Sequence, residues 1–198
     1  MALSFTDKLI GFLAKPAETF RAVRTESLKD AAVYYLLLLI FTSVLAGVMI
    51  YLGFSRVTGS FLGITLGPSA GIMSFVWAVV FFYIWGLLTL VVWAIVLQIG
   101  AKALGGKGTF DDAFKTAVYA QTPFLLLGWI PVVGAFLTQL WAVWLTIVGV
   151  RELYGVETGK AGAVAVVAFV VYLMAWWILF ILGYATAMGL AGIMGLTA

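Results

Sequence analysis

Residues 31–54 read AAVYYLLLLIFTSVLAGVMIYLGF, and this uncharged run decides the fold class. A bilayer core of about 30 Å is crossed by roughly 20 helical residues, so the run is long enough to span it. A water-soluble domain of this size leaves much of its surface exposed and cannot hide many such runs. We therefore predict that residues 31–54 form a transmembrane helix.

The rest of the chain has the same character. Its 198 residues are 65% hydrophobic and 10% charged, whereas about a quarter of a soluble domain is charged. Three further stretches contain no Asp, Glu, Lys or Arg: residues 57–101, 116–150 and 161–198. We predict an all-α polytopic transmembrane bundle over residues 31–198. Its five spans are expected at about 31–54, 72–101, 110–127, 133–150 and 161–183.

The stretch 110–150 allows two arrangements. It contains four residues that interrupt helices, namely Pro123, Gly128, Pro131 and Gly134. One continuous helix is therefore disfavoured, and we predict two helices joined by a turn at 128–131. The alternative is a re-entrant hairpin that does not cross the bilayer. Both arrangements return the chain to the same side.

The basic residues predict the orientation. Every Lys and Arg except Arg56 falls in residues 1–30 or in the loops 102–115 and 151–160. Cytoplasmic loops carry the excess of basic residues in membrane proteins. We therefore expect a cell-membrane protein with its N-terminus in the cytoplasm and its C-terminus on the opposite side.

Residues 1–30 form a separate N-terminal segment. Their apolar residues recur at helical spacing, which predicts an amphipathic helix, broken near Pro16, along the cytoplasmic interface. Acidic residues nearly balance the basic ones, so strong selectivity for anionic lipid is not expected. Membrane lipid is the expected partner of this segment, which would position the first span.

The composition excludes several kinds of chemistry. Without histidine or cysteine, the chain has no Cys/His zinc site, thiol nucleophile or histidine base. Of the Lys and Arg residues, only Lys115 falls in a predicted span, and Asp111 and Asp112 stand at the start of the same span. We therefore expect no enzymatic activity, cofactor or metal, and we attribute the net charge of +3 to topology rather than to nucleic-acid binding.

The turn from Gly105 to Thr109 invites comparison with a phosphate-binding loop. The Walker pattern fails, because Ala101 stands where it needs its first glycine and Gly108 follows Lys107. No nucleotide is therefore expected. The spacing of Thr109 and Asp112 resembles a capping box, which predicts a helix start at this point.

Polar residues and prolines inside the predicted spans have two interpretations. Interhelical hydrogen bonding is the favoured one, because such pairs are common in membrane bundles. The alternative is a broken helix that lines a binding site or pore. The residues concerned are Tyr119, Gln121, Thr122, Pro123, Pro131 and Gln139.

Three stretches together resemble the Yip1 domain family, in its compact prokaryotic form. They are LAKPAETF at 13–20, KALGGKGTFDDAFKTAVYAQTPFLLLGWIPVVGAF at 102–136 and WAVWLTIVGVRELYGVETGKAGAVAVV at 141–167. The resemblance implies a five-span membrane protein with a cytoplasmic N-terminus. Eukaryotic members act in vesicle trafficking, where they associate with prenylated Rab GTPases and with one another. This chain has about 30 residues where they carry a long cytosolic region.

The function that we expect is non-enzymatic. The protein would organise or recruit membrane components, either as a homo-oligomer or with another membrane protein. A small transporter or channel built on the broken helices of 110–150 is the alternative. Residues of the two inner loops are the candidate partner contacts: Lys107, Phe110, Asp111, Asp112, Arg151 and Glu152.

Overall fold

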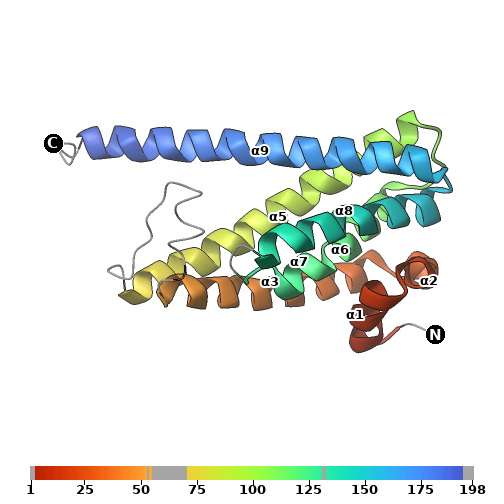
Figure 1. Cartoon of the computed structure of the whole chain (residues 1–198), viewed down its shortest axis with the longest axis horizontal. Helices are drawn as coiled ribbons and strands as arrows, with labels where there is room; N and C mark the ends of the chain where they lie inside the picture. The colour runs from red at the N-terminus through yellow and green to blue at the C-terminus, as the bar shows by residue number, and fades with distance from the viewer. Residues whose placement is uncertain (1–2, 53, 55–70, 131–132, 194–198) are drawn as a thin grey trace.

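The computed structural model describes residues 3–52, 54, 71–130 and 133–193, and throughout this part of the chain the regular elements are helices (Figure 1). Four of them contain segments long and apolar enough to cross a membrane, namely α3, α5, α8 and α9. The helices are α1 (Phe5–Ala14), α2 (Pro16–Ala22), the 3₁₀ helix η1 (Val23–Thr25), α3 (Leu28–Tyr51), α5 (Gly71–Ala103), α6 (Phe110–Ala120), α7 (Thr122–Leu127), α8 (Val133–Tyr154) and α9 (Thr158–Ile193).

The long helices correspond to the predicted spans, with different ends. α3 begins at Leu28, where Ser27 accepts a hydrogen bond from the backbone of Asp30. α5 has 33 residues and α9 has 36, so both exceed the predicted lengths. α9 continues past the predicted end at residue 183 to Ile193, because no charge or proline interrupts residues 161–193.

The prediction of a single helix over 110–127 is wrong. The segment forms the two short helices α6 and α7, and Gln121 lies between them. Pro123 stands in the first turn of α7, where its missing N–H removes no helix hydrogen bond. The proline therefore begins a new helix instead of kinking an old one, and the carbonyl of Tyr119 accepts from the backbone of Gln121.

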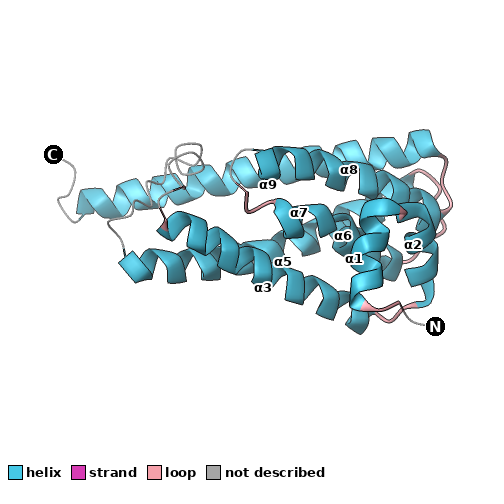
Figure 2. Cartoon of the chain, turned by 60° about the horizontal axis from the view of Figure 1, so that its bottom comes forward, coloured by secondary structure: helices cyan, strands magenta, loops and turns pink. Residues whose placement is uncertain are grey.

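α6, α7 and α8 form a hairpin that is shorter than the helices around it. In Figures 1 and 2 the hairpin ends beside the middle of α9, while α3, α5 and α9 continue past it. The turn predicted at 128–131 begins at Gly128, directly after α7. Pro131 lies outside the described residues.

Glycines allow α3 and α5 to approach closely. A Cβ at Gly47 in α3 would lie 2.8 Å from the side chain of Val79 in α5. In the same way, a Cβ at Gly86 in α5 would collide with the side chain of Leu39 in α3. Small residues at such contacts let helix backbones pack tightly inside a membrane. The hairpin and α9 therefore pack against a tightly joined α3–α5 pair.

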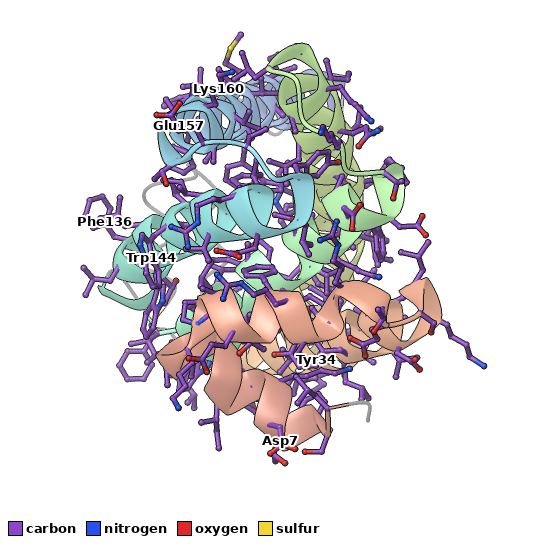
Figure 3. All side chains as sticks on the ribbon, turned by 90° about the vertical axis from the view of Figure 1, so that its right-hand side faces the viewer. Asp7, Tyr34, Phe136, Trp144, Glu157 and Lys160 are labelled. Atoms are coloured by element: carbon purple, nitrogen blue, oxygen red, sulfur yellow. The ribbon has the colours of Figure 1, made fainter. Side chains whose placement is uncertain are left out.

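The N-terminal segment folds back onto the bundle. α1 and α2 are separated at Lys15, which agrees with the predicted break near Pro16. α2 lies against α8 and α1 touches α7, so Phe12 and Phe20 are fully buried. Figure 3 looks onto this end of the bundle, with Asp7 pointing away from it. We call the region formed by α1, α2, η1, the loop 104–109 and the turn 155–157 the charged end.

Candidate functional site

Glu26 is the centre of a buried polar cluster at the charged end. It follows η1, and its carboxylate pairs with the ammonium group of Lys8 and accepts a hydrogen bond from the Tyr119 hydroxyl. The side chains of Lys8 and Glu26 are only 8% and 7% exposed. The Lys8 nitrogen also lies 6.0 Å from the ring centre of Tyr34. The cluster therefore ties α1, η1 and α6 together through one carboxylate.

Aromatic rings surround this cluster. Phe12 stacks on Tyr119 and meets Phe20 edge-on, with ring centres 4.5 and 4.9 Å apart. Tyr34 lies 5.3 Å from Tyr119 and 5.1 Å from Phe5. Such pairs add about 0.5–1.5 kcal/mol each beyond the area that they bury. The rings exclude water from the Lys8–Glu26 pair and hold α1 in place.

Lys115, the basic residue of the predicted spans, also has a hydrogen-bond partner within the chain. Its ammonium group donates to the backbone carbonyl of Arg24 at 2.7 Å, and its side chain is buried. A buried charge needs such a partner, since an unpaired one is costly. Lys115 therefore fixes η1 against α6. Sequence reasoning missed this role, because nothing local connects residues 24 and 115.

The residues considered for a transport path are mostly engaged in packing. The hydroxyls of Thr122 and Tyr34 lie 3.1 Å apart within hydrogen-bonding distance, and Gln121, Thr122 and Pro123 are buried. Among the described residues, the Gln139 side-chain oxygen is buried without a hydrogen-bond partner. A cavity of about 40 Å³ lies elsewhere, between α5 and α9, and Trp93 and Tyr172 contribute to its lining. The structure thus does not bring the predicted path residues to this cavity.

The glycine-rich turn is a cradle for Tyr154. A Cβ at Gly106 or Gly108 would lie 2.9 or 2.7 Å from Cδ1 of the Tyr154 ring, and Gly105 has a φ of 87° that favours glycine. The Tyr154 hydroxyl donates to the Thr109 carbonyl at 2.9 Å. The glycines are therefore explained by packing, because the loop lies too close to Tyr154, at the end of α8, for a larger side chain.

The loop 104–109 and the start of α6 carry four of the predicted partner contacts. Lys107 and Asp111 are exposed, and Phe110 is 45% exposed. Asp112 accepts a hydrogen bond from the Thr109 backbone at 2.7 Å, and the predicted capping box is confirmed. Lys107 donates its backbone N–H to the Tyr154 carbonyl at 3.0 Å. Its side chain and those of Phe110 and Asp111 remain at the surface of this end.

The other two predicted contacts are already paired within the chain. Glu152 accepts from Arg21 at 2.6 Å and from Arg151 at 2.7 Å. The hydrogen bond to Glu152 raises the pKa of Arg21. Glu152 therefore links α2 to α8.

The fold and composition define an all-helical membrane protein. The Yip1 domain matches residues 10–181, a region that includes Glu26, Tyr119, the Tyr154 cradle and the hairpin. The chain belongs to the Yip1 domain family. No curated protein and no solved structure matched the chain.

Proposed function

We propose that this protein is a non-enzymatic membrane protein that recruits or organises other membrane components through the loop 104–109 and the start of α6. The carrying observation is the exposure of Phe110, a large aromatic side chain, next to exposed Lys107 and Asp111. Aromatic residues are enriched at protein interfaces and supply much of their binding energy. The two opposite charges beside Phe110 would orient a partner.

The loop is held in a fixed shape, which supports this role. The Tyr154 cradle fixes the backbone at Gly106 and Gly108, and the capping box fixes the start of α6. A surface that is ordered before binding loses less conformational entropy when a partner docks. Phe110 is thus presented by a preorganised loop. The expected partner is a second copy of this chain or another membrane protein.

The orientation is part of the same proposal. The excess of Lys and Arg at the charged end favours a cytoplasmic location for this end, with the C-terminus across the cell membrane. The five-span arrangement counts α6–α7 and α8 as two crossings, and the re-entrant arrangement counts neither. Both arrangements leave loop 104–109 in the cytoplasm, with α1 and α2 at the cytoplasmic interface.

A transporter is the less well supported candidate. Its path would use Gln121, Thr122, Pro123, Pro131 and Gln139. Thr122 lies within hydrogen-bonding distance of Tyr34, and the adjoining Tyr119 is hydrogen-bonded to Glu26 in the packed interior. Interhelical hydrogen bonds of this kind stabilise membrane bundles. The contacts therefore support a structural role for these side chains, and recruitment remains the proposed function.

Photo-crosslinking in the native membrane tests the proposal. A photoreactive residue replaces Phe110, and the matched control places it at Ile10, which is 63% exposed on α1 at the same end. We expect one protein to be captured from position 110 and to be lost when Lys107→Glu and Asp111→Lys are added. Equal capture from both positions, or capture of lipid alone at 110, would overturn the proposal.

A further inference from the structure

One contact fixes how far the hairpin reaches along the bundle. The Thr42 hydroxyl of α3 donates to the backbone carbonyl of Leu125 in α7, so these residues lie at the same level. Tyr34 and Thr122 meet nearer the charged end. α3 continues past Thr42 to Tyr51, which at 1.5 Å per residue is about 13 Å of further helix.

The same contact gives the depth of the hairpin in a membrane. The apolar part of α3 begins at Ala31, so Thr42 lies about 17 Å into it. The hydrocarbon core is about 30 Å thick. Leu125 therefore lies near mid-membrane, and the turn that follows α7 reaches only a little further. Figures 1 and 2 agree, because α3, α5 and α9 extend beyond this turn.

The composition of α6 and α7 fits a partial crossing. α6 has 11 residues and carries Asp111, Asp112 and Lys115, whose charges are costly in hydrocarbon. α7 has only six residues. α8 is long enough to cross a membrane, but its Gly149 lies against Thr116 of α6 and Phe20 of α2, so its last part belongs to the charged end and not to the crossing. α6 thus occupies the polar boundary, and α7 is too short to complete a span.

In the described part of the turn after α7, three N–H groups find partners within the turn or in α7. The backbone N–H of Gly128 donates to the Phe124 carbonyl at 2.7 Å, and that of Ile130 donates to the Leu127 carbonyl at 3.0 Å. The indole N–H of Trp129 donates to the Leu126 carbonyl at 2.7 Å. Non-helical backbone at membrane depth needs such internal partners, because no water is available there.

We propose that residues 110–154 form a re-entrant hairpin, and that the resulting wedge shape makes the protein favour curved membranes. In the leaflet at the charged end, the protein comprises α3, α5, α9, the hairpin and the adjoining α1 and α2. In the other leaflet, the described residues contribute α3, α5 and α9. An inclusion that is wider in one leaflet is stabilised where that leaflet is stretched. With the proposed orientation, on which this inference rests, the cytoplasmic face becomes convex.

The N-terminal helices strengthen the asymmetry. α1 packs Phe12 into the bundle but exposes Phe5 and Ile10 at the charged end. Apolar residues on an interfacial helix insert between lipid headgroups, and such insertion depends on curvature. α1 and the hairpin therefore both widen the protein in the same leaflet. The partner that this shape fits is a lipid surface that is convex toward the charged end.

Cysteine labelling measures the hairpin depth in a chain that has no native cysteine. Single variants Leu127→Cys and Ile130→Cys are treated with a membrane-impermeant thiol reagent in sealed vesicles of both orientations. Lys107→Cys and Leu52→Cys are the matched controls for the two surfaces. We expect each control to react from one side and both hairpin positions to react from neither. Reaction at 127 or 130 from the side of Leu52 would overturn the re-entrant hairpin.

Reconstitution measures the curvature preference. The Lys107→Cys protein, labelled with a fluorophore, is inserted into a mixture of small and large vesicles of one lipid composition. We expect a several-fold higher protein density in the small vesicles, with the charged end facing outward, as shown by quenching from outside. Equal density and unbiased orientation in the two sizes would overturn the curvature inference. Neither readout depends on a captured protein, so failure here is distinct from failure of recruitment at Phe110.

Discussion

The ring of Phe12 stacks on the ring of Tyr119, with 4.5 Å between their centres and 16° between their planes. This contact joins the first helix of the chain to α6, and it lies beside the buried pair of Lys8 and Glu26. The charged end is thus held together by residues that are far apart in the sequence.

Truncation of Phe12 should loosen the N-terminal helices. Phe12→Ala removes a fully buried ring from the Tyr119 stack and should lower the free energy of unfolding by about 3–5 kcal/mol. Thermal unfolding in lipid nanodiscs measures the change. Ile10→Ala, on the exposed face of the same helix, should stay within about 0.5 kcal/mol of the native protein. Similar losses in the two variants would contradict the packing of Phe12.

Neutralising Glu26 should be costlier than removing the whole ion pair. Glu26→Gln leaves the Lys8 ammonium buried without its counter-ion, and breaking a buried pair in this way costs about 3–5 kcal/mol. The double variant Lys8→Met, Glu26→Gln removes both charges and should recover most of the loss. Denaturant titration of both variants checks the order. A double variant that is less stable than Glu26→Gln would show that the unpaired Lys8 ammonium is not the cause of the loss.

Gly108 should not tolerate a methyl group. Gly108→Ala places Cβ 2.7 Å from the Tyr154 ring, and overpacking of this kind costs about 1–3 kcal/mol. Because the cradle fixes loop 104–109, capture from position 110 should fall as well. Gly159→Ala is the control, since nothing lies within 4 Å of that position. Unchanged stability and capture in Gly108→Ala would show that packing against Tyr154 does not fix the loop.

Thr122→Val should destabilise the α3–α7 contact. Valine has nearly the shape of threonine but cannot hydrogen-bond to the buried Tyr34 hydroxyl. A buried polar group left without a partner costs about 1–3 kcal/mol. The thermal midpoint of the variant in nanodiscs should fall accordingly. No change in that midpoint would mean that the Tyr34 hydroxyl finds another partner in the variant.

Gln139→Leu should leave the thermal midpoint unchanged or raise it. The Gln139 oxygen is buried without a hydrogen bond among the described residues, and replacing an unsatisfied polar group by an apolar one is neutral or stabilising. The same thermal measurement should therefore give an equal or higher midpoint. A lower midpoint would indicate a bound partner for this amide, and liposome flux assays on the variant would then be the next measurement.

Sequence reasoning succeeded where one local property decides the structure. The uncharged run 31–54 predicted α3 because length and hydropathy are sufficient for a membrane-spanning helix. The Thr109–Asp112 spacing predicted the start of α6 because a capping box involves only four consecutive residues. The break between α1 and α2 beside Pro16 was equally local.

Sequence reasoning failed where distant residues decide the structure. Glu26 had no special place in the sequence, because its partners Lys8 and Tyr119 lie 18 and 93 residues away. Glu152 was predicted as a candidate partner contact, and its ion pair with Arg21, 131 residues away, was not foreseen. The helix break at Gln121 was missed for a related reason. A proline pattern alone does not distinguish a kinked helix from the first turn of a new one.

These long separations also set the order in which the protein can be assembled. α1 and α2 leave the ribosome before α6 and α8, but their docking surface requires Tyr119, Thr116 and Gly149, which are synthesised much later. During synthesis, Phe12 and Phe20 therefore wait at the membrane surface until α6 and α8 have been inserted. The N-terminal helices can thus dock only after the hairpin has folded. A quality-control protease could distinguish finished from unfinished chains by the accessibility of α1 and α2 alone.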